Sequence, residues 1–322
     1  MVWARADAGD PFASVELLRI ADDKAQALFD NCFEIVSGPD APDVTIQELD
    51  KELILMLSND NPLSNNYQEG YLVFDPGIPA LRTDGTPLDT VDRSYVFEGY
   101  HLYQLVDPTV GPDELDNPDR ARLIAQCDIQ NDISQIVNYT FDPLIEQSVP
   151  YLMVNGENEG IRHSFQVRND AFAQGDNRLI NYKTYYFMAI AYGYNEYEPF
   201  NPNSGAGQDV PYLASRKGAT GSIRIYDGEP HPTITEEGGT VAQAAYGDGV
   251  SMTRISGKGN GTHVIDITAD SEAKILENVF IDELEYVRGA GPVGVRVVDP
   301  LSVPNAEFEL ALAPGNADLD PE

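Results

Sequence analysis

Hydrophobic residues alternate with polar ones along most of the chain, a period of two that is typical of β-strands. Segment 44–57 is predicted to form two short strands joined by a turn at residues 49–51, with Val44 and Ile46 on one face. Segments 94–107 and 182–197 are rich in β-branched and aromatic residues. We expect 182–197 to be a central strand, buried on one face and lined with tyrosines on the other.

Further strands are predicted at 123–130 and at 219–228, the latter with Ile223 and Ile225 pointing inward. A hairpin is expected over 148–167, turning at Asn155-Gly156 or at Glu159-Gly160. The segments between these strands are rich in Asn, Asp, Pro and Gly. They are predicted to be loops or insertions, at 58–93, 108–122 and 199–211, and the insertion at 108–122 is expected to contain a single helical turn.

Only two segments have helical spacing. Apolar residues recur every three or four positions over 13–35, and the Pro- and Gly-containing run SGPDAPD ends that pattern. The second is a short helix at 270–278, which opens with Asp270 as an N-cap acid. We expect the first helix to lead into the next domain or to be the tail of a preceding one.

A domain boundary is predicted at 229–239, where prolines and glycines coincide. Strands are expected beyond it at 246–268, 291–300 and 307–313. The predicted organisation has four parts: 1–37, an N-terminal helix or arm; 38–230, a β-sandwich with long insertions; 231–314, a smaller β-rich module; and 315–322, an acidic disordered tail.

The composition adds a strong charge imbalance. The chain has 53 Asp and Glu against 20 Lys and Arg in 322 residues, a net charge of -33, which disfavours nucleic-acid binding and adhesion to anionic membranes. The acids are dispersed, as on a surface adapted to salty water, and 42% hydrophobic residues are enough to build cores. We therefore expect a folded, acidic, halophilic-type protein.

Targeting and cysteine signals are sparse. No run is long and apolar enough to span a bilayer, and the N-terminus lacks the basic and apolar regions of a signal peptide. We expect the chain to be either cytosolic or an internal piece of a longer exported protein. Cys32 and Cys127 either form one disulfide or remain two buried thiols, because sequence does not give their separation.

Several local motifs resemble those of fibronectin type III domains, which are seven-stranded β-sandwiches. In that family a tyrosine at the start of the sixth strand forms a tyrosine corner, a role that the resemblance gives to Tyr185 or Tyr186. The chain departs from the family at Leu57, near the place of the usual tryptophan, and in its long insertions. The motifs that carry the resemblance are PDAP at 39–42, then Phe97, Gly99, Tyr100 and Tyr103, and then Leu179, Tyr185 and Ala191.

A second resemblance covers most of the chain. Segments such as YVFEGYHLYQL, YKTYYFMAIAYGYN and GPVGVRVVDPLSVPNAEFEL look like parts of large secreted proteins of Bacteroidota. Those proteins typically end in a type IX secretion sorting domain, which is missing here. The resemblance implies an extracellular or cell-surface location and says little about activity.

Candidate catalytic motifs do not form. The histidines His101, His163, His231 and His263 stand singly, so we expect surface or packing roles for them rather than metal binding. No G-x-S-x-G elbow occurs, and GKGNGT at 257–262 fits a hairpin turn better than a phosphate loop. The sequons at Asn138 and Asn260 are interpreted as incidental. We therefore predict no catalytic, cofactor-binding or metal-binding residues.

Two clusters leave binding open. Calcium could use carboxylates of the segment 113–119, although a solvated face is the simpler interpretation: Asp113, Glu114, Asp116 and Asp119. Tyrosines on a sandwich face could stack sugar rings or dock a protein: Tyr182, Tyr185, Tyr186, Tyr192, Tyr194 and Tyr197.

The functional prediction is a non-catalytic structural, adhesive or spacer part of a secreted cell-surface protein or extracellular assembly. It would bind protein partners or self-associate, with no cofactor, no nucleic acid and no membrane insertion. The alternative is an accessory region, with carbohydrate binding among its roles, of a secreted multidomain hydrolase.

Overall fold

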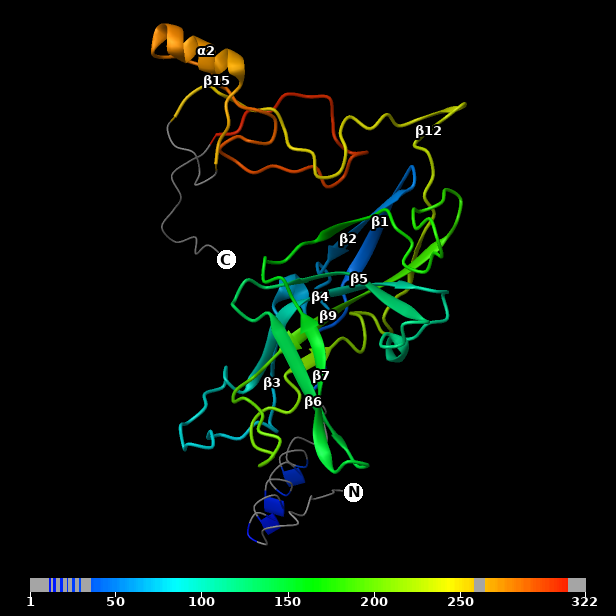
Figure 1. Cartoon of the computed structure of the whole chain (residues 1–322), viewed down its shortest axis with the longest axis vertical. Coiled ribbons are helices and arrows are strands. Elements are labelled where there is room, and N and C mark those ends of the chain that lie inside the picture. The colour runs from blue at the N-terminus through cyan, green and yellow to red at the C-terminus, as the bar shows by residue number, and fades with distance from the viewer. Residues whose placement is uncertain are drawn as a thin grey trace. The chain divides into compact units, whose positions relative to one another are not determined.

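The computed structural model describes residues 36–257 and 264–311, with nine further residues between Phe12 and Phe29. Strands make up 35% of the structure and helices 9%, so the predicted mostly β class is confirmed. The chain divides into two compact units on either side of the His231–Pro232 bond, and each is described by itself. Figure 1 shows the elements of each unit.

The first unit contains a three-stranded antiparallel sheet of β1 (Asp43–Leu49), β2 (Glu52–Ser58) and β8 (Ser164–Val167), in the order β1-β2-β8. The predicted strand pair at 44–57 is confirmed, since Val44 lies opposite Leu57 and Ile46 opposite Leu55. Lys51 turns the chain between them with a φ of 56°.

A second antiparallel sheet is built around β4 (Ser94–Leu105) and β9 (Tyr185–Tyr194), which pair along most of their lengths. The strand β4 also pairs with β3 (Leu72–Phe74) and β5 (Ala121–Asp128). On its other side β9 pairs with β10 (Tyr212–Ala214) and β11 (Tyr226–Gly228). The central position predicted for the strand at 182–197 is thereby confirmed.

The main core combines inward-facing side chains of both sheets. Leu53 and Leu55 of β2 belong to the same buried cluster as Tyr100 and Leu102 of β4 and Phe187 of β9. Each is no more than 1% exposed. Burial of one such side chain stabilises the fold by roughly 1.5–3 kcal/mol, so this alternation holds the two sheets together.

The outer face of the second sheet is also buried, which differs from the one-sided burial expected for 182–197. Met188 and Ile190 of β9 pack with Val110 and Leu115 of the 106–120 insertion, which contains the 3-10 turn η2 (Pro112–Glu114). Tyr192 is 0% exposed in a further cluster. The chain's own insertions cover this face.

One of those covers is a hairpin of β6 (Gln135–Asp142) and β7 (Gln147–Asn155). The predicted hairpin over 148–167 is therefore wrong, because β7 pairs with the preceding β6 and β8 joins β2 in the other sheet. Ile136 and Val154, opposite each other, are the buried contacts of the hairpin with the outer face. The partner of a strand is decided by burial against segments distant in sequence. The local alternation of apolar and polar residues gives no information about that partner.

Two shorter strands also differ from the prediction. The strand expected over 219–228 is regular only at β11, although Ile223 is buried as predicted. The strand β10, which was not predicted, directly follows the predicted loop at 199–211. The expected loop at 58–93 contains β3 and the 3-10 turn η1 (Tyr67–Glu69).

Tyr185, at the start of β9, is hydrogen-bonded to the backbone that precedes the strand. Its hydroxyl accepts a hydrogen bond from the backbone N–H of Ile180, with a nitrogen–oxygen distance of 2.9 Å. The preceding Leu179 is 1% exposed in the main core. Of the two tyrosines that the resemblance names, Tyr185 is the one whose hydroxyl accepts this backbone hydrogen bond.

The second unit has little regular structure in its described residues. Two-residue strands pair as β12 (Ile234–Thr235) with β13 (Gly238–Gly239) and as β14 (Thr253–Arg254) with β15 (Leu284–Glu285). The long strands predicted at 291–300, in the described parts of 246–268 and in the described part of 307–313 do not form, so these predictions are wrong. No opposing sheet is present within the described part of this unit to bury one face of such strands.

Its helix α2 (Ala269–Asn278) confirms the helix predicted at 270–278. The N-cap is Thr268, whose side chain accepts a hydrogen bond from the Ser271 N–H, so Asp270 is not the cap. Asp270 instead lies in the first turn, where its negative charge interacts favourably with the positive end of the helix dipole.

The described residues between Phe12 and Phe29 are all helical, as the pattern at 13–35 predicted. The rest of that segment and the tail at 315–322 lie outside the described residues. Among the helices that are described, none has the length and apolar character that crossing a bilayer requires.

Candidate functional site

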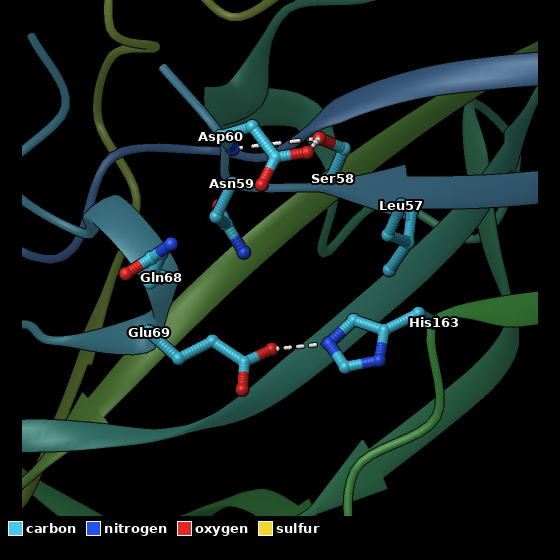
Figure 2. A pocket seen from close by; sticks show the side chains of 7 residues that line it. All are labelled: Leu57, Ser58, Asn59, Asp60, Gln68, Glu69 and His163. Carbon is cyan, nitrogen blue, oxygen red and sulfur yellow. Dashed lines mark hydrogen bonds and ion pairs between the residues drawn. The ribbon is translucent and has the colours of Figure 1, made fainter. Parts of the chain in front are cut away.

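A polar depression of about 280 Å³ lies at one end of the first unit's sandwich. Its walls are the end of β2 with the two residues that follow, the η1 turn, and the residue before β8. Figure 2 shows the side chains of Asn59, Glu69 and His163 around one space, with the carboxylate of Asp60 turned toward Ser58 above them. The other lining residues are Leu57, Ser58 and Gln68.

Backbone hydrogen bonds hold these walls together. The Leu57 N–H donates to the carbonyl oxygen of His163 at 2.7 Å, and the Gln68 N–H donates to that of Asn59 at 2.9 Å. Segments distant in sequence are thereby fixed at one place.

A chain of side-chain hydrogen bonds runs beneath the depression. The Asn59 amide nitrogen donates to the Tyr100 hydroxyl, which donates to Glu69 Oε1 at 2.7 Å. Tyr100 is 0% exposed, and burial followed by the nearby Glu69 carboxylate raises the pKa of its hydroxyl well above the usual range. Tyr100 therefore keeps its proton, and Glu69 is the acceptor in this contact.

His163 completes the network. Its Nε2 lies 2.6 Å from Glu69 Oε1, the oxygen that also receives the Tyr100 hydroxyl. An ionised carboxylate only accepts hydrogen bonds, so Nε2 carries a proton and, in the neutral imidazole, Nδ1 is an acceptor. This arrangement fixes the orientation of the ring.

The backbone at Glu69 is unusual. Gln68 and Glu69 have φ values of 50° and 63°, a left-handed conformation that residues other than glycine seldom adopt, least of all in succession. Such strain persists only where the surrounding structure enforces it. Here the strained turn directs Glu69 into the network.

The depression does not contain a nucleophile paired with a base. The only hydroxyl among the lining residues is that of Ser58, which donates to Asp60 Oδ2 at 2.6 Å rather than to His163. The depression offers hydrogen-bonding groups of several kinds, from two carboxylates, two amides, an imidazole and a hydroxyl.

A second depression, of about 340 Å³, lies beside β8. The carboxylate of Asp170 at its edge accepts hydrogen bonds from Gln104, Lys183 and the Phe172 N–H, at 2.7–2.9 Å. These contacts, with hydrogen bonding to Lys183 prominent among them, offset the effect of burial and lower the pKa of Asp170. This carboxylate anchors the loop after β8.

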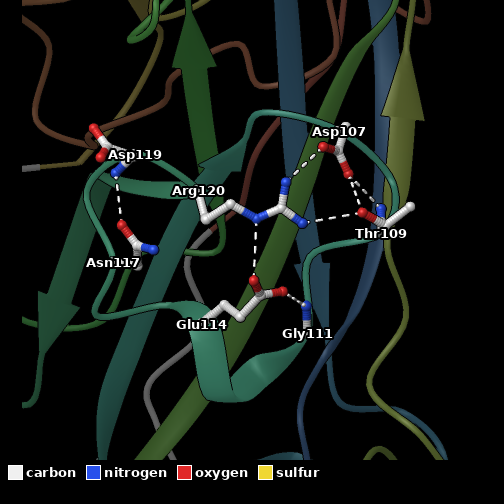
Figure 3. A network of polar contacts seen from close by, with 7 residues as sticks. All are labelled: Asp107, Thr109, Gly111, Glu114, Asn117, Asp119 and Arg120. Carbon is white, nitrogen blue, oxygen red and sulfur yellow. Dashed lines mark hydrogen bonds and ion pairs between the residues drawn. The ribbon is translucent and has the colours of Figure 1, made fainter.

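Of the four acids considered as calcium ligands, only Glu114 contacts an arginine, Arg120 (Figure 3). Arg120 pairs with Glu114 at 3.1 Å and with Asp107 at 2.7 Å. Glu114 also accepts the Gly111 N–H, which with Arg120 lowers its pKa. Within the described parts of the chain, no three His, Cys, Asp or Glu side chains are grouped to hold a metal ion.

The remaining histidines and cysteines have varied surroundings. His101 is 2% exposed, and its burial lowers its pKa to about 4. His231 lies 3.4 Å from Glu48. Cys127 is a buried free thiol. Cys32 and His263 lie outside the described residues.

The tyrosines of β9 do not form the expected open binding face. Tyr185 and Tyr192 are 3% and 0% exposed, and Tyr182, before the strand, is the exposed one at 69%. The sequon residue Asn138 has a structural role, since its amide exchanges hydrogen bonds with the backbone of Tyr212. The sequon at Asn260 lies outside the described residues.

Sequence reasoning missed a pair of buried carboxylates at the base of the β6–β7 hairpin. Glu98 and Asp128 are 1% and 2% exposed. Burial first, and then the neighbouring Asp128, raises the pKa of Glu98 to about 8, against the opposing effect of Asn131. Asn131, in the loop that enters β6, donates to both Glu98 oxygens at 2.9–3.0 Å. The N–H of Asn158, which follows β7, donates to Asp128.

The far end of the same hairpin is apolar and exposed. Figure 1 shows it projecting from the body of the first unit. Near the turn, Phe141, Leu144 and Ile145 are 47%, 91% and 57% exposed. Closer to the base, Tyr151 and Leu152 of β7 are 52% and 59% exposed.

Comparison with protein-family models, with curated proteins and with solved structures found no match to this chain. The functional argument therefore rests on the geometry described above.

Proposed function

We propose that this chain is a non-catalytic structural or adhesive region of a secreted cell-surface protein, acting through protein partners. The observation that carries the proposal is the projecting β6–β7 hairpin. Its exposed apolar residues lie on a rigid scaffold, because the hairpin base is pinned by the contacts of Glu98, Asp128 and Asn138. Exposed apolar groups on a fixed support are typical of interaction sites.

The charges around the hairpin indicate the kind of partner. No Lys, Arg or His occurs between Arg122 and Arg162, whereas six acids do. This acidic surrounding favours a partner with basic groups around an apolar contact, and it disfavours an anionic membrane or a second copy of this strongly acidic chain.

The strand order supports a fibronectin type III-like sandwich as the scaffold of the proposal. One sheet has the order β1-β2-β8, and the other places β4 and β9 at its centre with β5 and β10 outside them. The Tyr185 corner adds a contact found in such sandwiches. Sandwiches of this type commonly serve in cell-surface proteins.

The experiment compares one doubly substituted hairpin variant with a matched control on living cells. Cells of the source organism that lack their own copy are incubated with the labelled chain, and the retained label is measured. Leu144→Ser with Ile145→Ser is expected to reduce retention about tenfold or more. Leu63→Ser, at a residue that is 78% exposed in another loop, should retain the unaltered level. Equal retention of all chains, or none by the unaltered chain, contradicts the proposal.

A second candidate is an accessory carbohydrate-binding region of a secreted hydrolase. The polar depression at His163 favours it, since amides and carboxylates are groups that bind sugar hydroxyls. Glycan-array binding that is lost in Glu69→Gln would support this candidate over the first.

A further inference from the structure

We propose that the outer edge of β7 binds an extended, basic segment of a partner protein, which adds to the β6–β7 hairpin as a further strand. The inference rests on the proposed function, because it takes the same hairpin as the contact site. It goes beyond that function by naming the kind of partner segment and the backbone groups that hold it.

The edge of β6 that faces away from β7 is already in use. The Tyr139 N–H donates to the carbonyl oxygen of Asp209 at 2.7 Å, and the Asn138 side chain exchanges hydrogen bonds with the Tyr212 backbone. The sheet of β6 and β7 has no third strand in the described part of the chain. The open edge of the hairpin is therefore the outer side of β7.

The register identifies the backbone groups of β7 that point outward. Residues that face each other in an antiparallel pair either exchange backbone hydrogen bonds or direct these groups away from each other, and the two kinds of pair alternate. Tyr139 lies opposite Pro150 and directs its N–H to Asp209, so this pair is of the second kind. Pro150 therefore directs its backbone outward, as do Ser148 and Leu152, two positions to either side.

These outward groups are available for pairing. No hydrogen bond joins the backbone of Ser148, Pro150 or Leu152 on this side to another residue that the structure describes. Further along the edge, the carbonyl oxygen of Asn155 accepts a hydrogen bond from the Gln126 side chain of β5. An unpaired row of backbone groups is the kind of site to which an extended segment adds as a strand.

The charges along the hairpin select the occupant. Exposed acids lie at both ends of β7, with Glu146 before it and Glu157 and Glu159 after it. No Lys, Arg or His occurs between Arg122 and Arg162. Basic residues at the two ends of an added segment would complement these acids, whereas the β7 edge of a second copy would bring like charges together.

The side chains of β7 indicate the middle of such a segment. Tyr151 and Leu152 are 52% and 59% exposed, and as neighbours in a strand they lie on opposite faces. Pairs of aromatic and β-branched residues across two strands stabilise the sheet. We therefore expect β-branched or aromatic residues between the basic ends of the partner segment.

The experiment adds the peptide KKVTVTVKK to the full chain and follows hydrogen exchange of single amides by NMR. In the free chain the outward amides of Ser148 and Leu152 should exchange faster than the inward amides of Val149 and Tyr151. At saturation the basic peptide should slow exchange at Ser148 and Leu152 about tenfold or more. Two controls should not: the acidic peptide EEVTVTVEE, and the basic peptide methylated at two adjacent central nitrogens, which blocks both of its edges.

Variants test the edge itself. Pro150→Thr supplies the missing outward N–H and should tighten peptide binding about three- to tenfold, the effect of one hydrogen bond. Ser148→Pro removes an outward donor, rather than a donor to β6, and should weaken binding by a similar factor. Pro143→Thr, the same exchange in the turn of the hairpin, is the matched control and should leave binding unchanged.

No binding, equal binding of the methylated peptide, or no gain in Pro150→Thr overturns the inference. Preference for the acidic peptide also overturns it. Protection of Ser148 and Leu152 that grows with the concentration of the chain alone would show that two copies pair, and it contradicts the inference as well. Leu144→Ser with Ile145→Ser leaves the β7 edge intact. Unaltered cell retention of that variant therefore contradicts the proposed function while its peptide binding persists, so the two can fail separately.

Discussion

The two units of the chain show similar alternation in sequence but differ in regular structure. In the first unit, strands such as β4 and β9 have ten or more residues and are almost wholly buried. In the second, the described strands have two residues each, and Val295 and Val298 of an alternating segment are 39% and 47% exposed. Alternation produces long strands where another layer covers the apolar face.

In the first unit, both faces of the second sheet are covered. One face packs against the β1-β2-β8 sheet, and the other against the chain's insertions. In the described part of the second unit, only a few apolar residues are buried: Leu284, Tyr286 and Val297. Its conformation therefore depends on caps and turns more than on a large core.

The largest effect is expected from a cavity in the first core. Phe187→Ala should lower the first unit's free energy of unfolding by about 3–5 kcal/mol, because Phe187 is fully buried between the sheets. Leu284→Ala should cost about 2 kcal/mol and affect the second unit alone.

Urea unfolding followed by segment-resolved hydrogen exchange measures both changes. If Phe187→Ala does not fold, Phe187→Leu provides a milder cavity. A matching loss of protection in both units after either substitution would show that they unfold together.

The next effect tests the insertion layer. Glu98→Gln should raise stability at neutral and alkaline pH by up to about 3 kcal/mol. The folded-state pKa of Glu98, about 8, lies above the ordinary value of 4.5 for a glutamate carboxyl. Its stabilising contribution is therefore fully present below about pH 4.5 and is lost as pH rises toward 8.

Urea unfolding of both chains at several pH values provides the measurement. The difference between variant and unaltered protein should be near zero at pH 4 and largest near pH 8. Hydrogen exchange in β6 and β7 should slow in the variant. A difference that does not change with pH would contradict the burial argument.

A smaller effect is expected at the hydrogen bond between Tyr185 and the Ile180 backbone. Tyr185→Phe removes the acceptor for the Ile180 N–H and should cost about 1–2 kcal/mol of stability. Tyr182→Phe is the matched control, because Tyr182 is 69% exposed, and it should change stability by less than about 0.5 kcal/mol. Thermal unfolding measures the stability of both variants. Equal losses of stability would show that the Tyr185 hydrogen bond does not stabilise the fold.

The smallest effect concerns the acidic surface. Raising NaCl from about 0.05 to 1 M should increase the melting temperature by a few degrees, since salt screens repulsion among the excess carboxylates. Calorimetry in a salt series measures this. A melting temperature that falls with salt would contradict the salty-habitat hypothesis.

Much of the fold was predictable because its signals are local. Alternation located β1, β2, β4 and β9, and the periodic pattern at 270–278 located α2. The candidate site was not predictable. Glu69 and His163 are 94 positions apart and adjoin only because η1 and the start of β8 meet at the end of β2. No sequence spacing encodes that contact.

The sequence by itself determined the class of the fold, the acidic surface and the positions of the strongest strands, because side-chain period and charge are properties of neighbouring residues. The tertiary structure decided which strands pair, which tyrosines are buried and which acids meet. These depend on contacts between distant segments. Tyr192 and Glu98 are buried, and Glu69 contacts His163. As residue types they do not differ from the exposed tyrosines and acids of the same chain.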